Sequence, residues 1–65
     1  MKFDGAKLTE LIKKSRKRYI DVAEDLGVAR ETLHNWRTGK VQPRNNHVDK
    51  LAEIFGVNWK IFFKD

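Results

Sequence analysis

The stretch YIDVAEDLGVARETLHNWRTG, residues 19–39, decides the fold. Its apolar side chains recur at the three- and four-residue spacing of a single helical face, which predicts one short helix that ends at Gly27 and another over residues 29–38 that ends at Gly39. Glycine at both ends suits the left-handed conformation that commonly closes a helix. The expected inward positions are Tyr19, Val22, Ala23, Leu26, Leu33 and Trp36.

The flanking segments extend this helical pattern. An earlier helix is indicated by an N-cap residue and an apolar face, supplied by Asp4, Leu8, Leu11 and Ile12. A later helix begins at Asn45 or Asn46, after Pro43, and ends at Gly56. A last turn runs from Asn58 to Phe63, and no stretch of four or more residues alternates as a strand would. We therefore predict one all-α domain over residues 1–65, a compact five-helix bundle.

The composition excludes several functional classes. The 65 residues contain no Cys, and His34 and His47 lack the spacing of a zinc-binding pair, so no metal or other cofactor is expected. The sequence has neither a Ser, His and acid constellation nor a Gly-rich phosphate loop, so nothing in it indicates an enzyme or a small-molecule site. No apolar run is long enough for a membrane span or a signal peptide, and a cytoplasmic location is expected.

The positive charge is concentrated in the middle of the chain. The 14 Lys and Arg exceed the 9 Asp and Glu, which gives a net charge of +5. Residues 1–12 and residues 45–65 each carry equal numbers of acidic and basic side chains. The whole surplus therefore lies between Lys13 and Arg44, where an anionic partner is expected to dock.

Only about three residues separate the two central helices, so these helices are expected to cross steeply, as in a helix-turn-helix. The chain also resembles the Cro/C1-type helix-turn-helix family from about Ala6 to Phe63, without a gap. The resemblance implies a DNA-binding domain of a phage or bacterial transcription regulator, expected to be a repressor that acts as a dimer on a two-fold symmetric operator. The residues that carry it are Leu8, Leu11, Val22-Ala23, Leu26-Gly27-Val28, Trp36-Arg37-Thr38-Gly39-Lys40, Pro43, Leu51-Ala52 and Phe55-Gly56-Val57.

Several positions depart from the family pattern. Arg16, Lys17 and Arg18 stand where the family commonly has Gly, an apolar residue and Ser or Thr. Ala29 replaces a hydroxyl residue, so the following helix lacks its usual N-cap. Ile12 and Arg37 replace both members of the Arg and Glu ion pair of most relatives. We expect the Arg37 stem to lie against Ile12 and its guanidinium to reach solvent, a nearby acid or a phosphate.

The helix over residues 29–38 is the expected DNA-reading element. On a helical wheel, Leu33, Trp36, Ala29 and Arg37 face the core or its margin. By family position and by side-chain chemistry the base contacts are assigned to Arg30, Glu31 and Asn35, which suit guanine, cytosine and adenine respectively. Glu31 alternatively only stabilises the first helical turn through the helix dipole.

Contacts with the DNA backbone are expected on both sides of this helix. The predicted backbone contacts are Arg16, Arg18, Tyr19, Thr38, Lys40 and Arg44. The run of basic residues before Tyr19 is alternatively a solvated helix end. The Tyr19 ring can belong to the core while its hydroxyl binds a phosphate, because tyrosine is apolar along its body.

The C-terminal segment is rich in large apolar residues. One turn cannot bury all of Trp59, Ile61, Phe62 and Phe63 in so small a domain, so some are expected on an exposed patch. We predict a weak homodimer that forms mainly on DNA, with Trp59, Phe62 and Phe63 at its interface. The alternative function is a protein-interaction module, such as an antitoxin or anti-repressor, that uses this apolar end to hold a protein.

Overall fold

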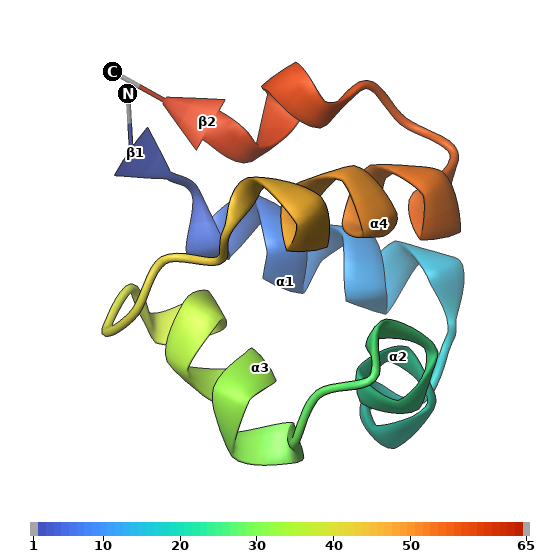
Figure 1. The fold of residues 1–65 in the computed structure, drawn as a ribbon. Coiled ribbons are helices and arrows are strands. Elements are labelled where there is room, and N and C mark those ends of the chain that lie inside the picture. Colours follow the sequence, from blue (N-terminus) through green and yellow to red (C-terminus); the bar gives the residue numbers. More distant parts are fainter. Residues whose placement is uncertain (1, 65) are drawn as a thin grey trace.

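The computed structural model describes residues 2–64; the ends of the predicted domain, Met1 and Asp65, lie outside the described residues. Four α-helices follow one another and enclose a single core (Figure 1). They are α1 (Gly5–Ser15), α2 (Tyr19–Leu26), α3 (Arg30–Thr38) and α4 (Asn45–Phe55). The fifth predicted helix is a short 3-10 turn, η1 (Trp59–Phe62). The predicted all-α class is thus confirmed, with a 3-10 turn in place of the last helix.

A small strand pair joins the two ends of the described chain. Strand β1 (Lys2–Phe3) is antiparallel to β2 (Phe63–Lys64), with Lys2 opposite Lys64 and Phe3 opposite Phe63. The sequence has no alternating stretch of four or more residues, and strands of two residues are too short to show such a pattern. The Phe3 ring stacks on Phe62 at 5.8 Å between centroids, so this pairing also closes one end of the core.

Local signals explain where the helices begin and end. The Asp4 side chain caps α1 by accepting hydrogen bonds from the backbone N–H groups of Ala6 and Lys7 at 3.1 and 3.2 Å. Helix α3 begins at Arg30, and Ala29 is its N-cap without a side-chain hydrogen bond. Ala29 is exposed, so its predicted place at the core margin was wrong. Helix α4 begins at Asn45, and its N-cap residue is Arg44.

All four α-helices end on a residue in the left-handed conformation. Gly27, Gly39 and Gly56 have φ angles of 72°, 80° and 65°, as the sequence predicts for glycine at these positions. Helix α1 ends instead on Arg16, with φ of 58°, and Arg16 is the one described residue other than glycine with a positive φ. An L-residue with a side chain is strained in this conformation.

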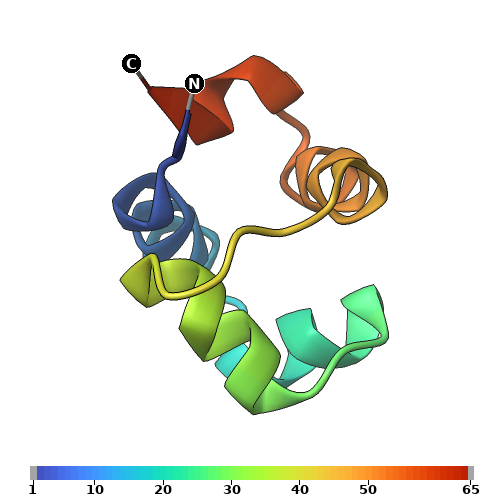
Figure 2. The same ribbon diagram turned by 60° about the vertical axis from the view of Figure 1, so that its left-hand side comes forward.

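Most residues that the helical periodicity predicts are buried in the core, together with Phe3 and Phe62 from the ends of the chain, while Leu11, Ile12 and Tyr19 are half-buried and pack against it. Helix α1 packs on α3, while α4 and η1 cover the other side (Figures 1 and 2). Among residues 2–64, no helix is long and apolar enough to cross a bilayer. The buried hydrophobic residues are Phe3, Leu8, Val22, Ala23, Leu26, Leu33, Trp36, Val48, Leu51, Ala52 and Phe62.

Candidate nucleic-acid interface

The turn between α2 and α3 sets the position of α3. The backbone N–H of Val28 donates to the carbonyl of Ala23 at 3.0 Å, and that of Gly27 donates to Glu24 at 3.0 Å, so the chain leaves α2 abruptly. Figure 1 shows α2 along its axis while α3 runs across the picture, which agrees with the steep crossing predicted from the sequence. Buried Leu26 and half-buried Val28 hold the turn on the core.

Helix α3 has one buried side and one exposed side. Leu33 and Trp36 are 0% and 2% exposed and fix the helix on the core. Arg30, Glu31 and Thr38 are exposed, as the helical wheel predicts. The third predicted base-reading residue, Asn35, is half-buried and not fully exposed; it lies where the chain turns at the end of α3, and the backbone N–H groups of Lys40 and Val41 donate to its carbonyl.

A shallow depression joins the beginnings of α2 and α3. It has a volume of about 330 Å³ and is lined by Tyr19, Arg30, Glu31 and His34. Two of the predicted base-reading residues therefore lie beside the first residue of α2. His34 is exposed at this depression and is a residue of this surface that the sequence analysis did not assign to the site.

Basic side chains lie on both sides of α3. Arg16 and Arg18 are exposed in the segment that enters α2, and Lys40 and Arg44 are exposed in the segment between α3 and α4. Figure 1 shows the first segment in cyan and the second in yellow, with α3 between them. Arg18 lies 3.8 Å from Asp21, but both side chains are largely exposed, so this pair binds Arg18 only weakly.

Thr38 and Tyr19 differ in how accessible their hydroxyl groups are. The Thr38 residue is exposed, and its hydroxyl donates to the Asn35 carbonyl at 3.3 Å. The Tyr19 hydroxyl oxygen is buried and has no hydrogen-bond partner among the described residues. In this conformation the hydroxyl does not reach the surface, and the ring packs against the core as the sequence predicts for its apolar body.

Arg37 is held by α1 and α2. Its Nε donates to the Thr9 hydroxyl at 3.0 Å, and its Cζ lies 5.0 Å from the centre of the Tyr19 ring. The Thr9 hydroxyl in turn donates to the Gly5 carbonyl at 3.0 Å. Among residues 2–64, no ion pair includes Arg37, so the acid considered as a partner for this guanidinium is not found within the described chain.

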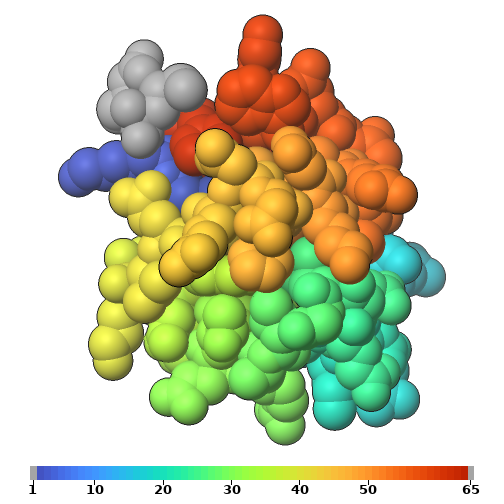
Figure 3. All heavy atoms as spheres, viewed as in Figure 1, coloured from blue at the N-terminus to red at the C-terminus, as the bar shows by residue number. Residues whose placement is uncertain are grey.

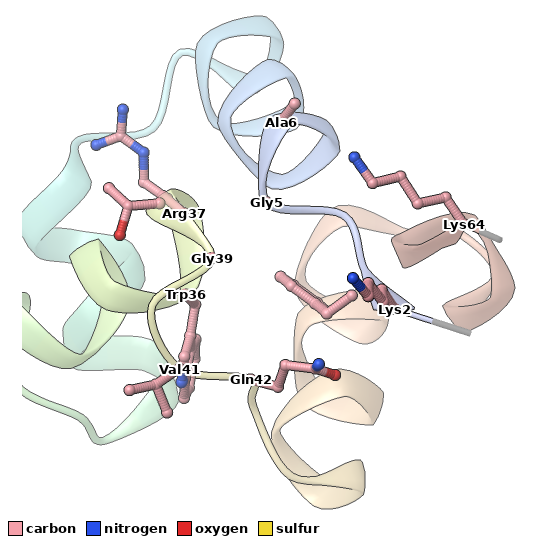
Figure 4. A pocket seen from close by; sticks show the side chains of 11 residues that line it. Lys2, Gly5, Ala6, Trp36, Arg37, Gly39, Val41, Gln42 and Lys64 are labelled. Atoms are coloured by element: carbon pink, nitrogen blue, oxygen red, sulfur yellow. The ribbon is translucent and has the colours of Figure 1, made fainter.

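A second hollow, of about 270 Å³, lies between the strand pair, the start of α1 and the end of α3 (Figure 4). Gly5 and Gly39 form part of its wall, and Lys2 and Lys64 stand at its rim. The Arg37 side chain borders this hollow but runs away from its centre. The hollow therefore separates the strand pair from α3 and does not include the predicted base-reading residues.

Near the start of the chain, the lysines of α1 are matched by an acid. Glu10 lies 3.1 Å from Lys14 and 3.2 Å from Lys7. Hydrogen bonding from Lys14 and then Lys7 lowers the pKa of the Glu10 carboxyl. Lys7 and Lys14 thus share one carboxylate, which offsets one of their two positive charges.

The apolar C-terminal segment divides into buried and exposed parts. Trp59 is 42% exposed and packs edge-on against half-buried Phe63, with 5.8 Å between ring centroids. Phe62 is 0% exposed, so its predicted place in an exposed patch is wrong: the 3-10 turn points this ring into the core. A hollow of about 230 Å³ remains beside the exposed ring, lined by Asn45, Val48, Asp49, Trp59 and Phe63. Three of these residues belong to α4, which lies above α2 and α3 in the space-filling view of Figure 3.

Two helices joined by a tight turn, with a polar outward α3 between basic segments, define a helix-turn-helix domain. The chain belongs to the Cro/C1-type helix-turn-helix DNA-binding domain family, whose model matches residues 7–60. Members of this family are DNA-binding domains and not a class of enzymes. Comparison with curated proteins and with solved structures found no match. Within residues 2–64, no cluster of three or more His, Cys, Asp or Glu is arranged to hold a metal ion.

Proposed function

We propose that this domain is a sequence-specific regulator of transcription, acting as a repressor, that places α3 in the major groove of double-stranded DNA. The observation that carries the proposal is the exposed polar side of α3 between two basic segments. Arg30 and Glu31 begin the helix and are free to reach base edges. Arg16, Arg18, Lys40 and Arg44, exposed on the two flanks, bind phosphates and set the register of α3.

Selection of bound sequences from random duplex DNA tests this function. A regulator of this kind enriches one motif and binds it with an affinity that falls steeply as the salt concentration rises. An antitoxin or anti-repressor shows only weak attraction that is the same for all sequences. The exposed Trp59 and its hollow would be the natural docking place in that second case. Failure to enrich any motif therefore overturns the proposed function.

Replacement of the base-reading side chains is expected to lower specificity. Arg30→Ala and Asn35→Ala each cost roughly 1–3 kcal/mol of binding free energy on the selected sequence and relax the preference at one base pair. Lys40→Ala is the matched control, because loss of a phosphate contact weakens binding to all sequences alike. Binding titrations on the selected and on random duplexes measure both effects. An equal loss on the two duplexes would make Arg30 a phosphate contact.

We further propose that two copies of the domain pair through Trp59 and Phe63 when bound to a palindromic site. Pairing would set two α3 helices about 34 Å apart, which is one turn of the duplex. The exposed apolar surface is small, so the dimer is weak in free solution. Trp59→Ser is expected to abolish cooperative binding to the full site and to leave half-site affinity unchanged.

Sedimentation of the free protein and titration onto full and half sites measure this pairing. Thermal unfolding of Trp59→Ser controls for loss of structure, which should be slight because the ring is 42% exposed. Strictly one protein on each full site would end the dimer proposal. Cooperative binding that survives in Trp59→Ser would place the interface elsewhere.

A further inference from the structure

Arg37 offers a guanidinium whose orientation is fixed from two sides. The hydrogen bond from its Nε to the Thr9 hydroxyl, at 3.0 Å, holds the group against α1. The Tyr19 ring covers one face of the guanidinium, with 5.0 Å from Cζ to the ring centre. Because Thr9 is itself bonded to the Gly5 carbonyl, the acceptor is also fixed. Little side-chain entropy is left for Arg37 to lose when it binds a ligand.

The charge of this guanidinium is not matched by an acid within the described chain. A guanidinium has five N–H donors. The hydrogen bonds of residues 2–64 use only the donor on Nε, and no carboxylate of these residues pairs with the side chain. Arg37 is only half-buried, so the donors on the two terminal nitrogens are available to an outside acceptor. A fork of two parallel N–H groups fits the oxygens of a phosphate.

Arg37 lies next to the surface that the proposed function assigns to DNA, so the phosphate it would bind belongs to the DNA backbone. Tyr19, against which the guanidinium stacks, is the first residue of α2 and directly follows the exposed basic residues 16–18. Figure 4 shows the side chain leaving α3 on the side away from the strand pair. The same Tyr19 ring lines the depression that contains Arg30 and Glu31. The guanidinium therefore lies at the edge of the surface that the proposed function turns toward DNA.

We propose that Arg37 is a further phosphate-binding residue, held in position by Thr9 and Tyr19, that contacts one phosphate of the DNA backbone beside the start of α2. This inference rests on the proposed function, because the ligand is the bound duplex. It gives one side chain two tasks: Nε joins α3 to α1, while the terminal nitrogens hold the DNA backbone. The guanidinium then aligns α3 directly with a fixed point on the duplex.

The salt dependence of DNA binding separates this role from a structural one. Arg37→Met keeps the apolar stem and removes the charge. The slope of log K against log salt, which is negative, is therefore expected to become shallower by about 0.9, for selected and random duplexes alike. Arg37→Lys keeps the slope but binds several-fold more weakly, because one ammonium cannot bond Thr9 and a phosphate in the same geometry. Thr9→Val keeps both the charge and the slope, and also weakens binding several-fold because the guanidinium is no longer held.

A duplex with single neutral methylphosphonate groups identifies the phosphate directly. One methylphosphonate, at the DNA position that faces the start of α2, is expected to weaken DNA binding by the wild-type protein about as much as Arg37→Met does. The same methylphosphonate should not weaken binding by Arg37→Met any further. Circular dichroism of each variant below its unfolding temperature establishes that it is folded. Should Arg37→Met fail to fold, Arg37→Lys and Thr9→Val still give the test, since unchanged affinity in both overturns the proposal.

The outcomes distinguish this inference from the proposed function. If the wild-type protein binds its selected sequence and Arg37→Met, folded, shows the same slope as wild type, Arg37 is a structural residue only. If every methylphosphonate acts equally on wild type and Arg37→Met, no single phosphate is its partner and the inference fails. If the wild-type protein enriches no sequence at all, it is the proposed function that fails.

Discussion

Gly5→Ala is expected to destabilise the domain by about 3 kcal/mol, the upper part of the usual cost of overpacking a core. A Cβ built on Gly5 would lie 2.2 Å from the carbonyl oxygen of Arg37 and 2.7 Å from that of Trp36. Both atoms belong to the backbone, so the two helices must separate to make room. Alanine is otherwise the better helix former by up to about 1 kcal/mol, and the steric cost exceeds that gain.

Thermal unfolding measures this effect, with Gly56→Ala as the matched control. Each kcal/mol shifts the Tm of a domain of this size by roughly 4–8 °C. Gly56 has a φ of 65° but nothing within 4 Å of its built Cβ, so its replacement costs only the strain of the left-handed conformation. Gly5 lies in a helix and does not have a positive φ, so the cost of Gly5→Ala comes from steric overlap alone. A Gly5→Ala variant no less stable than Gly56→Ala would show that α1 and α3 approach less closely than described.

Arg16→Gly is expected to move stability and DNA binding in opposite directions. Relief of the left-handed conformation, with φ of 58°, raises the free energy of unfolding by about 1 kcal/mol. Loss of the guanidinium removes one proposed phosphate contact. The negative slope of log K against log salt therefore becomes shallower by about 0.9, and affinity at 0.1 M salt falls several-fold. The physical reason is that glycine suits the backbone here while arginine suits the ligand.

Two controls isolate these effects. Arg16→Asn also removes the charge but tolerates the left-handed conformation less well than glycine, so it should lose the same affinity and gain less stability. Lys60→Ala removes an exposed charge from η1, away from the proposed interface, and should leave the slope unchanged. Thermal unfolding and titrations at several salt concentrations give both quantities. Equal DNA affinity in Arg16→Gly and wild type would remove Arg16 from the interface.

The helices were predictable from local chemistry. Leu33 and Trp36 at helical spacing, followed by Gly39, contain the information for an amphipathic helix and its end, and the structure has both. The outward side of α3 follows from the same periodicity, which is why Arg30 and Glu31 were placed correctly on the surface. These features depend on residues within a few positions of one another.

Features that depend on how distant segments meet were not predictable. The Arg37 and Thr9 hydrogen bond joins residues 28 positions apart and requires the close approach that Gly5 permits. The division of the C-terminal aromatics, with Trp59 exposed and Phe62 buried, depends on a 3-10 turn and on pairing of β2 with β1. No periodic pattern in a segment of five residues distinguishes those alternatives.

The strand pair also determines where the chain could be connected to something else. Lys2 and Lys64 lie opposite each other, so both ends of the described chain emerge together, across the second hollow from the end of α3 and far from its first residue (Figures 1 and 4). A short linker between them would cost little closure entropy, and a circular permutant opened at exposed Gly56 would keep α1 to α4 contiguous. A fused protein attached at either end would emerge at the strand pair, away from the start of α3, which the proposed function turns toward DNA.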